Sequence, residues 1–196
     1  MKTTLYLTIP LMILVMTACN TKDNAGKYHT QDAMDAIFAR TSIRSYQPQA
    51  VEEEKIELLL RAGMAAPSGK NVQPWELVVV DDRAALDAMA AALPYAKMLA
   101  QAPMAIVVCA DTTKSSYWYV DCSAVAENIL LAAQALGLGA VWTATYPYAD
   151  RMDVVAETLA LPETIHSLCV IPVGYPADRP APKDKWKPEK VHRNRW

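Results

Sequence analysis

The sequence lacks the charge balance and composition of several broad classes of protein. Its 196 residues carry 19 Lys and Arg against 21 Asp and Glu, a formal net charge of −2, so no overall positive charge favours nucleic acid. With 53% hydrophobic and 20% charged residues, it is neither a disordered nor a collagen-like chain. A length of 196 residues fits one globular domain.

The motifs of metal sites and of serine hydrolases are also missing. None of the 4 cysteines has CxxC spacing, and the 3 histidines form no HExxH or other paired ligand set. There is no GxSxG motif for a nucleophilic serine. Cys109 and Cys169 lie in apolar, strand-like runs, which predicts small buried thiols.

Two glycine-containing segments fail as phosphate-binding motifs. Five residues separate Gly63 from Gly69 where a P-loop has four, and Asn71 stands where that motif needs Ser or Thr. Gly137-Leu-Gly139 continues to Trp142 and precedes a strand, so it is no dinucleotide fingerprint. We therefore expect neither a P-loop nor a Rossmann-type nucleotide site.

The N-terminus has the pattern of an export signal. Lys2 precedes an apolar run at residues 5–16, and small residues follow it. The run is shorter than the about 20 residues of a spanning helix, and Pro10 interrupts it. We expect residues 1–18 to be a signal peptide.

The end of this run resembles a bacterial lipobox. Met16-Thr17-Ala18-Cys19 has Met where Leu is usual. Cys19 would then be acylated and would become the N-terminus, with residues 19–30 as a polar tether. This predicts a lipid-anchored protein of the cell envelope that faces away from the cytoplasm, on the periplasmic side. An uncleaved anchor and an ordinary secreted protein are the alternatives.

Beyond residue 30, helical and strand patterns alternate within one domain, residues 31–196. Thr30 is a plausible N-cap for a first helix that has Met34, Ile37 and Phe38 on one face. We expect helices near residues 31–40, 52–65, 82–93, 119–136 and 150–160. We expect strands near residues 75–81, 103–110, 140–145 and 168–173. From Tyr175 to Trp196 the prolines and charges predict an extended arm.

Three polar segments remain as candidate binding sites. Arg40-Thr41-Ser42-Ile43-Arg44 places two guanidinium groups around hydroxyls at a helix end, although arginines there also simply complement the helix dipole. Residues 66–75 form a polar loop that leads into a strand. Residues 179–196 carry 7 basic and 2 acidic side chains, which are either a solvated surface or a grip for phosphate.

Taken in order, four motifs resemble those of the nitroreductase-like flavoprotein family. They are RTSIRSYQPQAV, APSGKNVQPWELVVV, GLGAVWTATYP and VGYPADRPAPKDKW, and the resemblance covers residues 31–196. It implies an α+β fold with a central, mainly antiparallel sheet flanked by helices. It also implies an intertwined homodimer with an extended C-terminal arm and one FMN at each end of the dimer interface.

The resemblance implies a set of FMN-binding residues. Arg40 and Ser42 would hold the phosphate and ribityl chain together with Lys183 and Lys185, and Arg44 would lie beside the pyrimidine end of the flavin. Two positions depart from the family pattern: Thr41 stands where a second Arg is frequent, and Lys185 where Arg is commoner.

The remaining implied contacts come from a loop and a strand. Pro67, Ser68, Gly69 and Asn71 would approach the flavin from the other subunit. Backbone amides around Thr143, Ala144 and Thr145 would face the flavin N5. No metal and no catalytic side chain is expected, because the cofactor carries the chemistry.

The implied activity is that of an FMN-dependent NAD(P)H oxidoreductase. It would reduce nitroaromatic or quinone-type acceptors by ping-pong hydride transfer. One alternative is a membrane-tethered flavin carrier or redox sensor that turns over no dissolved substrate. Another alternative is a branch of the family that dehalogenates substrates or degrades flavin. Members of that branch use extra lid segments, and this compact chain offers little room for one.

Overall fold

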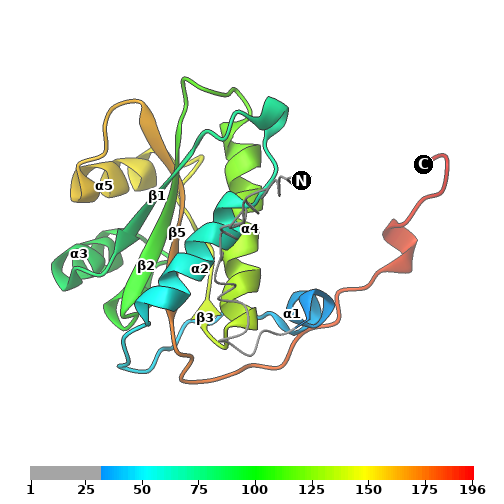
Figure 1. Cartoon of the computed structure of the whole chain (residues 1–196), viewed down its shortest axis with the longest axis horizontal. Helices are drawn as coiled ribbons and strands as arrows, with labels where there is room; N and C mark the ends of the chain where they lie inside the picture. The colour runs from blue at the N-terminus through cyan, green and yellow to red at the C-terminus, as the bar shows by residue number, and fades with distance from the viewer. Residues whose placement is uncertain (1–31) are drawn as a thin grey trace, which may run out of the picture.

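The computed structural model describes residues 32–196, in which helices and strands alternate (Figure 1). The helices are α1 (Ala33–Ala39), α2 (Glu53–Met64), α3 (Arg83–Ala92), α4 (Trp118–Ala135) and α5 (Ala149–Leu159). The strands are β1 (Trp75–Val80), β2 (Met104–Asp111), β3 (Gly139–Ala140), β4 (Thr143–Ala144) and β5 (Ile165–Gly174). The expected signal peptide, the lipidated Cys19 and the tether at 19–30 lie outside the described residues.

The strands form one sheet in which every pairing is antiparallel. Its order is β1-β2-β5-β3, and β4 also pairs with β5. The strand β5 therefore lies at the centre and continues directly into the arm. The expected α+β fold with a mainly antiparallel sheet flanked by helices is confirmed.

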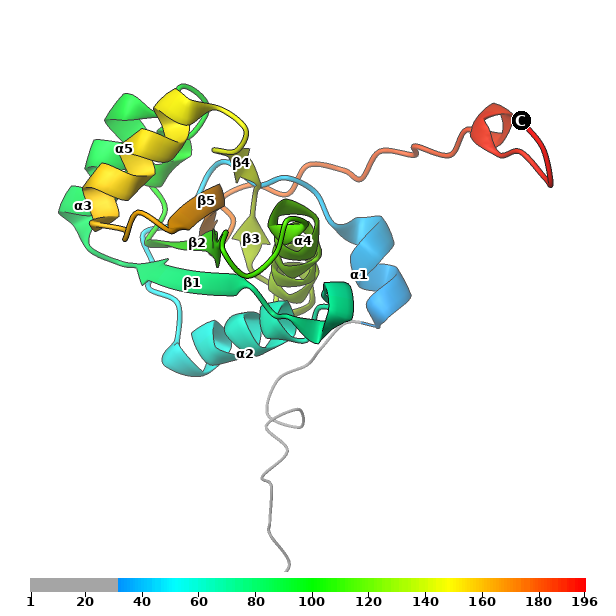
Figure 2. The ribbon, with the colours of Figure 1, turned by 90° about the horizontal axis from the view of Figure 1, so that it is seen from above.

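Helices cover both faces of the sheet (Figures 1 and 2). Alternate residues of β2 point to opposite faces, as the pleat of a strand requires. Ile106 and Val108 pack with α2 and α4, whereas Ala105 and Val107 pack with α3 and α5. The helices α2 and α4 approach closely at Gly63, where a Cβ atom would lie only 2.9 Å from Ile129. The sheet is thus buried on both sides.

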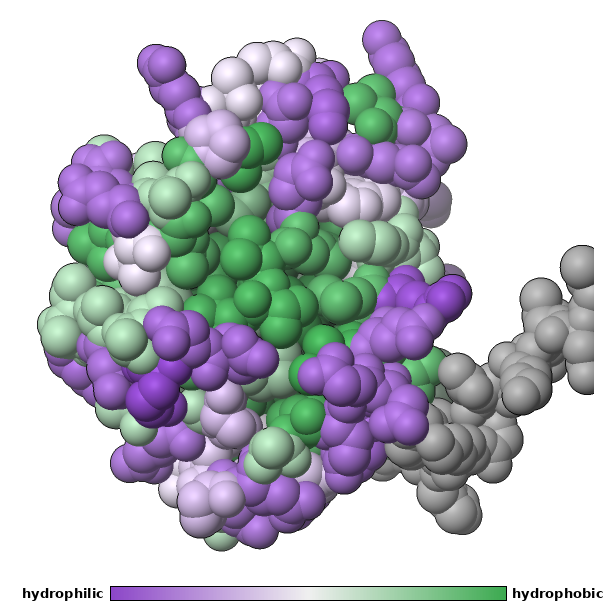
Figure 3. Space-filling view, turned by 60° about the vertical axis from the view of Figure 1, so that its left-hand side comes forward, coloured by the Kyte–Doolittle hydropathy of each residue, from purple (hydrophilic) through white to green (hydrophobic). Residues whose placement is uncertain are grey.

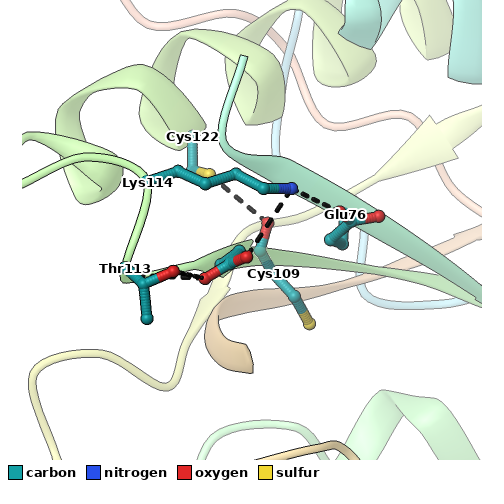
Figure 4. Close-up of polar contacts among 6 residues, drawn as sticks. Glu76, Cys109, Thr113, Lys114 and Cys122 are labelled. Carbon is teal, nitrogen blue, oxygen red and sulfur yellow. Dashed lines mark hydrogen bonds and ion pairs between the residues drawn. The ribbon is translucent and has the colours of Figure 1, made fainter. Parts of the chain in front are cut away.

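Three thiols lie inside this core. Cys109, Cys122 and Cys169 are buried and free, which confirms the prediction for Cys109 and Cys169. The Cys122 thiol donates a hydrogen bond of 3.4 Å to the Cys109 carbonyl oxygen (Figure 4). Nearby at the surface, Lys114 forms ion pairs with Glu76 and Asp111. Burial raises the pKa of Cys109 and of Cys122 to about 12, so both thiols stay protonated at neutral pH.

Most predicted elements agree with the structure to within a few residues, but two predictions were wrong. Helix α1 is capped by Asp32, whose side chain accepts a hydrogen bond from the Met34 amide at 2.9 Å, and not by Thr30. The single strand expected at residues 140–145 is divided into β3 and β4, which pair with different parts of β5. Val141 and Trp142 form the break.

Hydrophobic side chains also reach the surface. Figure 3 shows one face with a hydrophobic centre surrounded by hydrophilic side chains. Helix α1 separately exposes Met34, Ile37 and Phe38, which are 54%, 48% and 70% exposed. The apolar face of α1 therefore does not pack into the core of its own chain. Exposed apolar surface of this kind is typical of contact with another molecule. Within residues 32–196, no helix has both the length and the hydropathy needed to cross a membrane.

Candidate functional site

The two cationic segments of the sequence are brought together by a short antiparallel pairing. The Gln47 amide donates to the Tyr175 carbonyl at 2.8 Å, and the Ala177 amide donates to the Ser45 carbonyl at 3.0 Å. Between them, Tyr46 and Pro176 form an isolated β-bridge. The chain after α1 and the start of the arm therefore run side by side (Figure 2).

The start of the arm is also attached to helix α2. The Tyr175 hydroxyl lies 2.6 Å from Lys55 Nζ and 2.8 Å from both carboxylate oxygens of Glu52. The hydrogen bond from Tyr175 lowers the pKa of Glu52. Burial alone would lower the pKa of Lys55, but Tyr175 and Glu52 outweigh it and raise that pKa. Both groups are therefore charged at neutral pH, and this cluster fixes the point at which the arm leaves the body.

A groove of about 970 Å³ opens between the chain after α1 and the arm. It is lined by Ile37, Phe38, Arg40, Thr41, Ser42, Arg44, Pro180, Ala181, Pro182, Lys183, Asp184, Lys185 and Trp186. This lining contains four cationic side chains and one carboxylate, together with two hydroxyl groups. The lining includes six of the residues predicted to bind the cofactor: Arg40, Thr41, Ser42, Arg44, Lys183 and Lys185. This donor set suits an anion with several oxygens.

One cation of the groove already has an acidic neighbour. Arg40 Nε lies 3.6 Å from Glu127 Oε1 on helix α4, and the Glu127 side chain is 51% exposed. Such a surface ion pair contributes only about 0–1 kcal/mol. A phosphate group in the groove would compete with it readily, because phosphate offers Arg a bidentate, more highly charged partner.

The loop at residues 67–71 lies away from the groove of its own chain. Its Gly69 amide is bonded to Asp121 in the first turn of α4, whereas Arg179 of the arm donates to the Gly137 carbonyl, beyond the last turn of α4. None of Pro67, Ser68, Gly69 and Asn71 is among the residues that line the groove of the same chain.

Thr143, Ala144 and Thr145, the expected amide contacts of β4, are not among the residues that line the groove. The Thr143 hydroxyl donates to the Val170 carbonyl at 2.5 Å, and the Thr145 amide donates to the Leu168 carbonyl at 3.0 Å, so both residues bond toward β5. Ala144 lies between them and faces the outer edge, where its carbonyl accepts from Arg151 at 3.4 Å. Because one residue of an antiparallel strand directs its amide and carbonyl to the same side, Ala144 has the outward-facing amide.

Sequence reasoning missed three residues that shape these sites. Asp121 holds the 67–71 loop, Glu127 contacts Arg40, and Arg151 bonds the Ala144 carbonyl. Asp121 and Glu127 look like ordinary helix acids in the sequence, and their partners lie 52 and 87 residues away. No local pattern could have indicated these contacts.

Among residues 32–196, no group of three or more His, Cys, Asp or Glu is arranged to hold a metal ion.

The fold agrees with what comparison with known proteins shows. The sequence profile of the nitroreductase family matches residues 37–94 and 87–175. The chain belongs to the nitroreductase family.

Individual relatives extend this match. A protein from Methanothermobacter thermautotrophicus, provisionally named an NADH dehydrogenase/NAD(P)H nitroreductase, is 41% identical over 174 residues, or 87% of this chain and 91% of the relative. A crystal structure from Bacteroides thetaiotaomicron with the same provisional name is 63% identical, with a TM-score of 0.84 over 85% of this chain and 99% of that chain. A provisional nitroreductase from Desulfovibrio desulfuricans, crystallised in complex with FMN, is 31% identical, with a TM-score of 0.73 over 85% and 98% of the two chains.

Proposed function

We propose that this protein is an FMN-dependent NAD(P)H oxidoreductase that works as a homodimer. The observation that carries the proposal is the groove, which is lined by four cationic side chains and one carboxylate. It is supported by the relatives named NAD(P)H nitroreductases and by the relative crystallised with FMN.

The lining of the groove fits the phosphate end of FMN. Arg40, Lys183 and Lys185 supply positive charge, and the hydroxyls of Thr41 and Ser42 supply donors for phosphate and ribityl oxygens. Charge-assisted hydrogen bonds of this kind contribute about 1.5–3 kcal/mol each. FMN has a single phosphate group, and that one phosphate is sufficient to engage these donors.

The dimer completes the proposed site. The loop with Pro67, Ser68, Gly69 and Asn71 does not line the groove of its own chain, so it would reach the flavin held by the partner subunit. The apolar residues of α1 and the 70% exposed Trp186 of the arm would then be covered by the partner.

The chain's own part in the reaction is to orient and to stabilise charge. FMN, when bound, supplies hydride transfer at N5 and develops negative charge at its pyrimidine end. Arg44 in the groove would stabilise that charge electrostatically, and the outward amide of Ala144 would face N5. The acceptors would be flat nitroaromatic or quinone-type compounds that enter after the oxidised nicotinamide leaves, in ping-pong order.

Spectroscopy of the purified protein tests this function. We expect a yellow protein with a flavin spectrum that releases FMN on denaturation, is bleached anaerobically by NADH or NADPH, and regains its colour with a quinone. Released FAD, or no flavin uptake by the refolded protein, would refute the cofactor assignment. Reduction by NAD(P)H without catalytic turnover of quinones or nitroaromatics would favour the flavin carrier.

We further propose that the mature protein is anchored by lipid at Cys19 on the periplasmic side of a bacterial membrane. This is supported by the basic start, the apolar run and the small residues before Cys19. A random-coil segment of about 11 residues has a root-mean-square span of ~17–20 Å, so an anchor at Cys19 would let the flavin work close to the bilayer. Because nicotinamide cofactors are chiefly cytoplasmic, a membrane-associated donor would serve the enzyme in the cell.

Metabolic labelling tests the anchor. Cells given a palmitate analogue should label the wild-type protein, and Cys19→Ala should abolish the label and shift the protein out of the membrane fraction. An unlabelled, cytosolic wild-type protein would contradict the proposal.

A further inference from the structure

A buried carboxylate outside the groove holds the loop that precedes β1. Asp121 is only 6% exposed, although it lies in the first turn of α4. Its Oδ1 accepts a hydrogen bond of 2.9 Å from the Gly69 amide, and its Oδ2 lies 3.4 Å from the Ser115 hydroxyl. Burying a carboxylate is costly unless donors surround it, so these contacts are what keep Asp121 in place.

The loop that Asp121 holds has an unusual backbone. Lys70, Asn71 and Gln73 have φ values of 53°, 57° and 52°, the left-handed region that residues with a side chain rarely adopt. Residues 69–73 are all exposed, so packing around them does not enforce this shape. Such strain persists where neighbouring contacts over-determine it, and it clusters at ligand sites.

Within the loop, the Asn71 amide donates to the Ser68 carbonyl at 3.0 Å and the Val72 amide to the Gly69 carbonyl at 3.1 Å. Two hydrogen bonds to side chains add further constraint. The Ser68 hydroxyl accepts from the Gln73 amide at 2.9 Å, which closes the loop on itself. The Gly69–Asp121 bond connects the closed loop to α4, which is packed against the sheet. Asp121 thereby sets the position of the adjacent Lys70 and Asn71 relative to the rest of the protein.

We infer that Asp121 is a positioning residue of the cofactor site: it fixes the 67–71 loop on α4 in the shape that presents Ser68 and Asn71 to the flavin of the partner subunit. This inference rests on the proposed function. Asp121 itself touches no cofactor. It acts through the Gly69 amide, and an acceptor oxygen is the property that matters, not the negative charge.

Two substitutions separate the acceptor from the charge. Asp121→Ala removes the acceptor, whereas Asp121→Asn keeps a carbonyl oxygen at the same place. Asp82→Ala is the matched control, because Asp82 also accepts from a backbone amide (Ala85, 2.9 Å) but caps α3 on the other side of the sheet. All are measured in the full mature chain for FMN dissociation constant, melting temperature and the rate of trypsin cleavage after the exposed Lys70.

The expected pattern distinguishes positioning from general stability. Asp121→Ala should weaken FMN binding at least about tenfold and speed cleavage after Lys70 by a similar factor. Asp121→Asn should restore both to within a few-fold of wild type. Asp82→Ala should lower the melting temperature and leave both readouts unchanged.

Other outcomes would overturn the inference. Wild-type FMN affinity in Asp121→Ala, or faster cleavage without any loss of affinity, would show that the anchored loop does not serve the cofactor. Equal losses in Asp82→Ala would show a general effect of stability. If the wild-type protein binds no FMN, the proposed function fails instead, and the cleavage rates then report only on the loop.

Discussion

The sheet with its covering helices and the groove beside the arm are built in opposite ways. In β2, residues 104–110 are at most 2% exposed and pack on both faces, so the strand is complete without any other molecule. In the groove, Lys183, Lys185 and Trp186 are exposed, and the lining contains four cationic side chains and one carboxylate. The first region is satisfied within one chain, whereas the second has surplus charge and uncovered apolar surface. Stability and binding should therefore respond to different substitutions.

Removing the arm is expected to have the largest effect. A chain ending at Tyr175 lacks the groove lining of residues 180–186 but keeps all five strands. We expect it to lose FMN and to become monomeric or to aggregate, as measured by released flavin and by light scattering. A chain ending at Lys187 is the control, because it keeps the lining. A stable, yellow, truncated monomer would contradict both the dimer and the groove.

Replacing the two groove lysines should come next. Lys183→Ala with Lys185→Ala removes two charge-assisted contacts, so FMN should bind more weakly by about 3–6 kcal/mol, at about 1.5–3 kcal/mol each. The melting temperature of the FMN-free protein should hardly change. Lys187→Ala with Lys190→Ala removes two charges of the same arm outside the groove lining and should leave the dissociation constant nearly unchanged. Unchanged flavin retention in the groove variant would refute the assignment.

The buried thiols give an intermediate effect that is confined to the core. Burial raises the pKa of Cys109 and Cys122 from 9.0 to about 12. Above pH 9 the unfolded chain releases these protons while the folded protein keeps them, so stability falls as pH rises through this range. The expected loss is about 1.4 kcal/mol per pH unit for each thiol. Cys122→Ala should reduce the pH dependence of the free energy of unfolding by the contribution of one thiol, as measured by denaturant unfolding between pH 9 and 10.5. An unchanged slope would argue against the burial of Cys122.

The smallest effect is expected at the acidic neighbour of the groove. Glu127→Gln frees Arg40 from a weak surface pair, so FMN should bind more tightly by about 0.2–1 kcal/mol. Glu57→Gln is a matched control, because Glu57 pairs with Arg61 on helix α2, and neither residue lines the groove. The difference in FMN affinity should be measured by titration at low ionic strength, where salt screens surface charges least. Weaker FMN binding in Glu127→Gln would mean that Glu127 supports the cofactor instead of competing with it.

The sequence predicts the core better than the site. Local periodicity is enough to place α4 and β2 within a residue, because both bury long apolar stretches. The break between β3 and β4 was missed, since Val141 and Trp142 continue the strand-like pattern through it. The cap at Asp32 was missed because Thr30 is an equally good capping residue in sequence.

The candidate site depends on contacts that sequence cannot show. The basic motifs indicate an anion site, but only the pairing of Gln47 with Tyr175 shows that two of them share one groove. That the 67–71 loop does not line this groove is likewise visible only in the structure. The left-handed backbone of Lys70 and Asn71 is equally invisible, since neither is glycine.

The central position of β5 has a consequence for biosynthesis. This strand spans residues 165–174 of 196, and β2, β3 and β4 all pair with it. While the chain is being made, β1 and β2 can pair early. The other edge of β2 stays unpaired until β5, some 60 residues further along, has been synthesised. Pairings between distant segments form slowly because the loop must close first. The sheet therefore closes only when synthesis is nearly finished, and a chain that leaves the cytoplasm during synthesis would complete its fold, and meet its cofactor, only after export.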